Sequence, residues 1–189
     1  MTGLQPSPQL VQVAAELEEC SVRAGRLAGP LSPDKLSIRP QPGSWSVAEC
    51  LDHLSLTTEA YLPRLDEALA DVRNQGLTGS GPFRMEWTAR LLRFMLEPPA
   101  RLRTRTSAPF VPSGITPEQA LPRFLALQKT LLTKLHDAAG LALDRVKIRS
   151  PFAERVRYNL YSAFVLIAVH ERRHLWQAEK AIESLRAGR

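Results

Sequence analysis

The sequence lacks most features that mark specialised protein classes. Only two of its 189 residues are cysteine, Cys20 and Cys50, which excludes a disulfide-stapled scaffold and predicts reduced, buried thiols. A membrane span needs ~20 apolar residues, and even the apolar stretch 163–169 is far shorter. The N-terminus has no basic segment followed by an apolar run, as a secretion signal would. These absences predict a cytoplasmic protein with no membrane partner.

Acidic residues are outnumbered, with 19 Asp and Glu against 25 Lys and Arg, and the net charge is +6. This excess predicts weak attraction to anionic partners. However, acids are interleaved through most predicted helices, and aromatic residues do not alternate with basic ones as in nucleic-acid-binding chains. We therefore expect no nucleic-acid partner. The densest basic group, Arg101, Arg103 and Arg105, lies in a proline-rich connection and is interpreted as a solvated loop.

Val and Ile are sparse, whereas Leu, Ala, Glu and Arg are abundant, and this balance favours helix over strand. The chain length is close to that of an ordinary single domain, which gives no reason to divide it. We therefore predict one all-α domain that spans residues 1–189.

Four amphipathic segments account for the predicted core. The second of them begins with a capping box, in which Ser46 and Glu49 satisfy each other's backbone N–H groups, and it contains Pro63 as a kink. The simplest architecture for four such segments is a four-helix bundle. The predicted helices span residues 8–29, 47 to about 76, 117 to about 140, and a start between 151 and 158 to about 185.

Two segments between these helices are rich in proline and glycine. Residues 30–44 contain four prolines and one glycine and are predicted to form an ordered or extended connection. Residues 77–115 are less regular and include a short amphipathic helix over 84–97. The segment 77–115 is interpreted as a long insertion between the second and third core helices.

Three of the four histidines have a spacing that suits a shared metal ion. His170 and His174 are four residues apart on the last helix, so both rings face the bundle interior about one turn apart. His53 lies at the flank of the apolar stripe on the second helix. If these two helices are neighbours, the three imidazoles form a metal site with a fourth position open. Alternatively, the rings are held by ordinary hydrogen bonds, for example with Glu171 or Gln177.

Glu49 and Gln177, which lie near the histidines in the sequence, each have two possible roles. Glu49 either accepts the His53 ring N–H and fixes its tautomer, or remains a capping residue. Gln177 either contacts metal-bound water or substrate, or forms a hydrogen bond within the bundle. Cys50 is read as a packing thiol rather than a fourth ligand. His136 stands alone near the end of the third helix, where it suits the helix dipole and is structural.

Two segments resemble the signature segments of the DinB-like (DinB/YfiT-type) metal-binding four-helix bundles. Residues 43–54 read GSWSVAECLDHL and are followed by Tyr61 and Arg64, and residues 170–177 read HERRHLWQ. The resemblance extends over nearly the whole chain in helix order and spacing, although 77–115 is longer than the compact family pattern. It implies one divalent transition metal, zinc foremost with nickel or iron as alternatives, bound by His53, His170 and His174.

The resemblance leaves the chemistry open between two kinds of enzyme. Family members look like metal-dependent hydrolases or transfer low-molecular-weight thiols such as bacillithiol, mycothiol or glutathione. Both activities need an open coordination position, so we predict a metal-dependent hydrolase or thiol S-transferase that acts on a small molecule. The alternative is a non-catalytic, metal-stabilised module for small-ligand binding or stress response. Pairing into a homodimer through a helix face is also expected, without an identified face.

Overall fold

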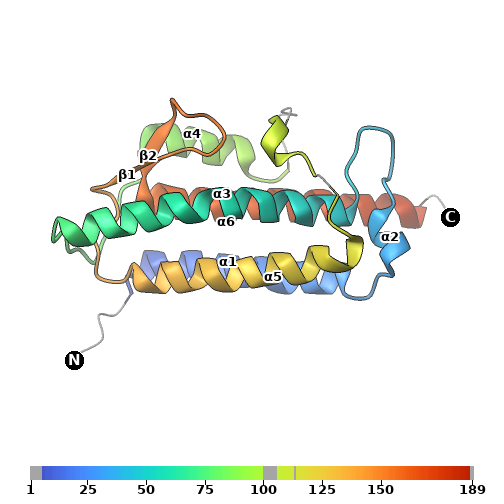
Figure 1. The fold of residues 1–189 in the computed structure, drawn as a ribbon, viewed down its shortest axis with the longest axis horizontal. Coiled ribbons are helices and arrows are strands. Elements are labelled where there is room, and N and C mark those ends of the chain that lie inside the picture. Colours follow the sequence, from blue (N-terminus) through green and yellow to red (C-terminus); the bar gives the residue numbers. More distant parts are fainter. Residues whose placement is uncertain (1–5, 100–105, 113, 188–189) are drawn as a thin grey trace.

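The computed structural model describes residues 6–99, 106–112 and 114–187, and it confirms the all-α prediction (Figure 1). Within these residues lie six α-helices, one 3-10 helix and a two-stranded sheet. The Arg101, Arg103 and Arg105 group lies outside the described residues. The four long helices lie side by side and are α1 (Pro8–Ala28), α3 (Val47–Asn74), α5 (Pro117–Asp137) and α6 (Leu160–Ala187).

The helix starts follow the predicted capping chemistry in two of three cases. The Ser7 hydroxyl accepts from the backbone of Leu10 at the start of α1. At the start of α3, Ser46 accepts from the Glu49 backbone and the Glu49 carboxylate accepts from the Ser46 N–H, which is the predicted capping box. Thr116 occupies the N-cap of α5, but its side chain makes no capping hydrogen bond.

Ion pairs between α1 and α6 show that the two helices run in the same direction. Glu16 of α1 pairs with Arg172 of α6, and Arg23 of α1 pairs with Glu179 of α6. From the first pair to the second, the residue number increases by seven on each helix, so α1 and α6 are parallel. The helices are tied along their length rather than at one point.

The same reasoning applies to α3 and α5. Asp52 of α3 pairs with Arg123 of α5, and farther along Asp66 pairs with Lys134. These two neighbours are therefore parallel as well. A chain that joins parallel neighbours must return along the whole bundle before the second helix begins.

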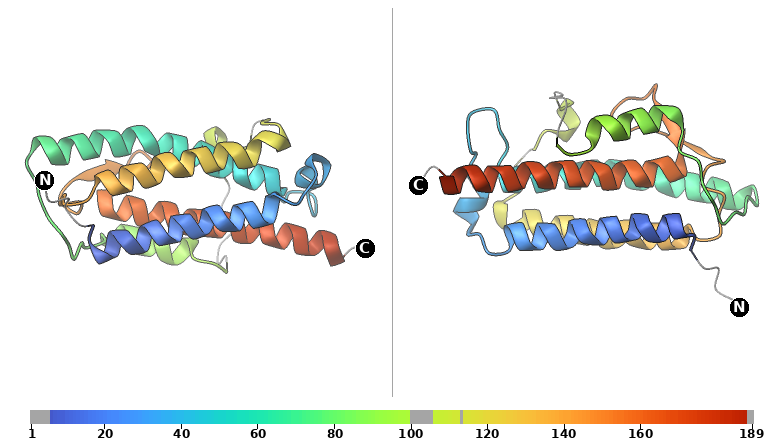
Figure 2. Two further views of the ribbon diagram at one scale, coloured as in Figure 1. Left: turned by 90° about the horizontal axis from the view of Figure 1, so that it is seen from below. Right: turned by 180° about the vertical axis from the view of Figure 1, so that it is seen from behind.

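The segment 77–115 makes this return. It leaves α3 beside the end of α5, through an isolated bridge between Thr78 and Leu141. Farther along, α4 (Trp87–Leu96) packs on α6 and the 3-10 helix η1 (Ala108–Phe110) packs on α3 (Figures 1 and 2). What the sequence suggests as an insertion is thus the crossover that the parallel arrangement requires.

The last helix begins later than predicted. A hairpin of β1 (Lys147–Arg149) and β2 (Arg157–Asn159) precedes it, with Ile148 opposite Tyr158, and α6 starts only at Leu160. Side chains of β1 alternate between exposed and buried, which is the period of a strand and not of a helix. The 30–44 connection also contains a short helix that was not predicted, α2 (Pro33–Ser37).

The core consists of two apolar clusters with a buried polar layer between them. One cluster includes Leu65 of α3, and the other includes Leu51 of the same helix. The side chains between them on α6 and α5 are buried and polar: His170, Glu171, His174 and Gln128. No helix among the described residues has both the length and the apolar character needed to cross a membrane.

Candidate metal centre

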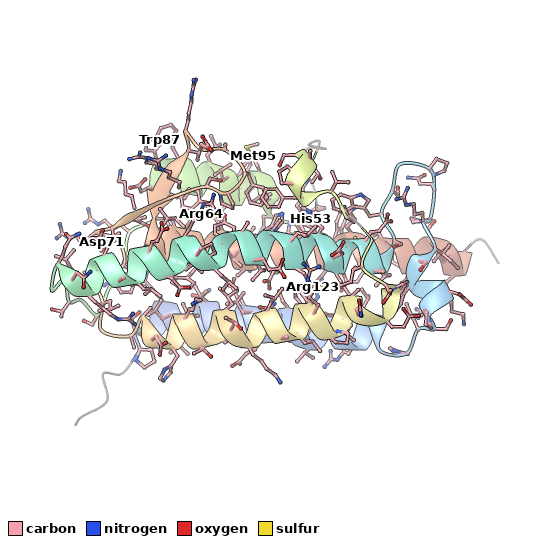
Figure 3. All side chains as sticks on the ribbon, viewed as in Figure 1. His53, Arg64, Asp71, Trp87, Met95 and Arg123 are labelled. Atoms are coloured by element: carbon pink, nitrogen blue, oxygen red, sulfur yellow. The ribbon has the colours of Figure 1, made fainter. Side chains whose placement is uncertain are left out.

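Antiparallel packing of α3 against α6 brings the three predicted histidines together. His53, labelled on α3 in Figure 3, faces His170 and His174 of α6. The Nε2 atoms of His53 and His170 are 3.3 Å apart, and one ligand atom from each of the three rings lies within 4.8 Å of the others. Three nitrogen donors from two helices thus surround one point.

The tautomer of His53 is set by a backbone group. Its Nδ1 lies 2.7 Å from the carbonyl oxygen of Phe110, which belongs to η1. A carbonyl oxygen only accepts hydrogen bonds, so Nδ1 must carry the proton. The lone pair of His53 Nε2 then points into the histidine cluster, as a metal ligand requires.

Burial keeps the three rings neutral. The exposed fractions are 2% for His53, 9% for His170 and 8% for His174. Desolvation is the largest cause and lowers the pKa of all three rings. Arg173 lowers the pKa of the two rings on α6 further, whereas the Phe110 carbonyl and Asp52 oppose the fall at His53. Neutral imidazole is the form that binds a metal ion.

The donor set fits a divalent transition metal. The Nδ1 atom of His174 is buried and has no hydrogen-bond partner among the described residues. A buried nitrogen without a hydrogen-bond partner costs free energy, which calls for an explanation such as an ion bound by the histidine cluster. Three imidazoles with space for a further ligand match the usual open sites for zinc, and imidazole also suits nickel and iron.

Aromatic side chains cover the cluster. Trp45 stacks on His174 with ring centroids 5.6 Å apart and an interplanar angle of 28°, and it also contacts His53. Phe152, from the loop between β1 and β2, lies 5.4 Å from the His170 ring and packs against Phe110. Phe152 is 40% exposed, so it separates the buried histidines from solvent on its side.

The sequence model of the DinB superfamily matches residues 16–178, which includes all three histidines. The chain belongs to the DinB superfamily. No curated protein and no solved structure matches it significantly. Family membership accords with the resemblance seen in the two histidine-containing segments, and the activity of this superfamily member has to be argued from its own site.

Three further residues that the sequence places near the histidines of this DinB superfamily protein, Glu49, Gln177 and Cys50, have different contacts. The Glu49 carboxylate is taken up by the Ser46 N–H and by Arg39, so Phe110 and not Glu49 meets the His53 ring. Gln177 interacts with His174 and partly offsets the fall in its pKa. Cys50 is buried in the apolar cluster beside Leu51, and burial raises the pKa of its thiol.

His136 is the remaining histidine, and its side chain is 84% exposed at the end of α5. It lies outside the three-histidine cluster, as the sequence predicts. Because it is exposed and remote from the other three, it serves as an internal control for histidine substitutions.

Sequence reasoning missed two contacts of the site in this DinB superfamily protein. The Phe110 carbonyl leaves no mark in a sequence because every residue carries such a group. Phe152 belongs to a loop whose position depends on the hairpin, and the hairpin was not predicted either. Trp45 directly precedes the capping residue Ser46, and its ring covers two of the histidines.

Proposed function

We propose that this DinB superfamily protein binds one divalent transition-metal ion, zinc foremost, through His53, His170 and His174. In this proposal the protein is a metal-dependent hydrolase or thiol S-transferase that acts on a small molecule, and the ion is its cofactor. The convergence of three neutral imidazoles from α3 and α6 carries the proposal. Three protein ligands leave a position free for water, a thiolate or a substrate oxygen.

A bound ion of this kind lowers the pKa of a water molecule or thiol in the free position and so supplies a nucleophile at neutral pH. The residues of the chain prepare the site for this chemistry. The Phe110 carbonyl holds the His53 ring in the ligating tautomer. Trp45 and Phe152 keep bulk water from the rings, which strengthens electrostatic interactions at the site.

Elemental analysis of the purified, untagged protein tests the binding step. We expect about one ion per chain, with near-complete loss in His53→Ala and His174→Ala and no loss in His136→Ala. The His136 variant controls for the removal of a histidine as such. Absence of metal after reconstitution with zinc, nickel or ferrous iron would refute the proposal, as would equal loss in the His136 variant.

A second experiment separates the two activities. The cobalt-substituted protein is titrated with glutathione, and a thiolate-to-metal charge-transfer band, absent in His53→Ala, would support thiol transfer. Hydrolysis of a p-nitrophenyl ester that depends on metal and is lost in the same variant would support the hydrolase. If both assays are negative while metal is bound, glutathione transfer and ester hydrolysis are excluded as activities of the site.

The surroundings of the histidines favour one further candidate. Trp45, Phe110 and Phe152 bring no acid or base to the site. Apolar walls around a metal suit a module that captures a small apolar ligand without turnover. A ligand-induced rise in melting temperature, together with negative results in both activity assays, would select this second function.

A further inference from the structure

The outer face of α4 carries large apolar side chains that the bundle does not cover. Ala89 on its inner face is fully buried, whereas Trp87, Leu91 and Phe94 are 74%, 52% and 59% exposed. These three positions recur at helical spacing and form one stripe that faces away from α6, and Figure 3 marks Trp87 on the outer side of the molecule. Stripes of this kind on a folded domain mark interaction sites.

Arginines flank this stripe. Arg90 and Arg93 follow one side of it, and Arg84 lies just before the helix; with Phe94 and Glu97 they line a cleft of about 550 Å³. Arg93 is 3.7 Å from Glu97. Within the part of the chain that the structure describes, neither Arg84 nor Arg90 forms an ion pair. The stripe is therefore bordered by the positive charges of Arg84 and Arg90, which have no ion-pair partner among the described residues.

The neighbouring hairpin extends this charge. Lys147 of β1 pairs with Glu86 at 3.0 Å, which ties the hairpin to the start of α4. Arg149 lies directly opposite Arg157 in the sheet, and both side chains are exposed. Like charges opposite each other destabilise a sheet, and an anionic partner would offset that cost. The hairpin and α4 lie on the same outer side of the α3–α6 layer (Figure 1).

We propose that the outer face of α4 docks on an anionic lipid surface, with Trp87 and Leu91 in the headgroup region and Arg90 against lipid phosphates. Tryptophan and leucine on one side of a helix, with arginine beside them, are typical of helices that lie in a membrane interface. Such a helix rests on the membrane and does not span it, so the proposal agrees with the lack of a spanning helix among the described residues. The sequence-based expectation of no membrane partner rested on the absence of a spanning segment and of a secretion signal.

A second copy of the chain fits this face less well. If two α4 helices paired antiparallel through their stripes, Arg90 of each copy would lie close to Arg93 of the other. Because like charges brought together oppose association, self-pairing is disfavoured where an anionic surface is favoured. The arginines beside the stripe therefore favour an anionic lipid surface over a second copy of the chain.

Co-sedimentation of the full chain with vesicles tests the proposal, using phosphatidylcholine with about 30 mol% phosphatidylglycerol against phosphatidylcholine alone. We expect binding to the anionic vesicles only, weakened by added salt. Affinity should fall about tenfold or more in Trp87→Ser/Leu91→Ser and in Arg90→Glu. The matched controls Val22→Ser and Arg26→Glu alter exposed residues of α1, in the other layer, and should bind like the wild type.

A measurement on the wild-type chain guards against misfolded variants. Brominated lipid should quench the fluorescence of the wild type, and Trp87→Phe should lose most of this quenching. The proposal is overturned if the wild type does not sediment with anionic vesicles or if the α4 variants bind as tightly as the controls. Retention on duplex DNA without vesicle binding, or a dimer that Trp87→Ser/Leu91→Ser abolishes, would also overturn it.

Discussion

Two buried polar groups lie on different sides of α6 at the same level of the bundle, and they differ in how their polar atoms are arranged. Toward α3, His170 and His174 meet His53. Glu171, which directly follows His170, points instead toward α5 and α1. It accepts a hydrogen bond from Gln128 and lies near Cys20. Both groups interrupt an otherwise apolar core.

The difference lies in what each group needs. Burial raises the pKa of Glu171 to about 8, so at neutral pH the acid is mostly uncharged. Its Oε2 accepts from the Gln128 amide, whereas Glu171 Oε1 and Gln128 Oε1 have no hydrogen-bond partner among the described residues. The histidines instead direct several lone pairs at one point, and lone pairs cannot satisfy one another. Burial of polar residues is therefore not by itself evidence of a metal site, whereas three imidazole rings directed at one point are.

The largest expected effect is on the histidine side. Zinc at about 1,000 times its Kd should stabilise the folded chain by ~4 kcal/mol, because the unfolded chain lacks the assembled site. Thermal melting with zinc and with a chelator measures this difference. The zinc-dependent shift should vanish in His53→Ala and persist in Glu171→Gln. Persistence in both variants would show that the ion binds elsewhere.

The Glu171 side should respond to pH. Its pKa rises from 4.5 in the unfolded chain to about 8 in the folded one, so the folded state holds the proton more tightly and loses stability as pH increases between these values. Over about 1.5 pH units near neutrality the loss should reach ~2 kcal/mol. Urea unfolding in the presence of a chelator compares the wild type with Glu171→Gln.

Because the histidines titrate alike in both proteins, their contribution cancels in this comparison. The Gln variant should lack the additional pH dependence and be the more stable protein at alkaline pH. Identical pH profiles for the two proteins would contradict a raised pKa at Glu171.

The smallest expected effect concerns Glu49. Its carboxylate caps α3 and pairs with Arg39, so Glu49→Gln should cost ~0.5–1 kcal/mol in stability. Zinc affinity, measured by competition with a chromophoric chelator, should change less than about twofold. A loss of about 10- to 100-fold is typical when the hydrogen-bond partner of a ligand is removed, and it would mean that Glu49 supports His53 after all.

The sequence predicts the long helices and the histidine cluster because both depend on local, periodic information. Caps such as Ser7 and Ser46 fix the starts of α1 and α3, and the four-residue spacing of His170 and His174 places both rings on one face. The position of His53 opposite them required the additional assumption that α3 and α6 are neighbours, which the packing confirms.

Other features depend on contacts between distant parts of the chain. Strands β1 and β2 have three residues each, too few for their alternation to be distinguished from the start of a helix. The crossover role of 77–115 follows from the parallel direction of α3 and α5, which no local pattern encodes. The hydrogen bond from His53 to Phe110 depends in turn on where that crossover passes.

X-ray absorption spectroscopy of the zinc-loaded protein, in thiol-free buffer, tests the central claim most directly. Our account predicts three imidazole nitrogens at about 2.0–2.1 Å and one exchangeable oxygen. A sulfur at about 2.3 Å that replaces this oxygen when glutathione is added would select the thiol S-transferase over the hydrolase. Loss of the imidazole signal in His174→Ala, with retention in His136→Ala, would assign it to this cluster. A sulfur ligand before any thiol is added, or a shell of oxygen alone, would contradict the three-histidine site.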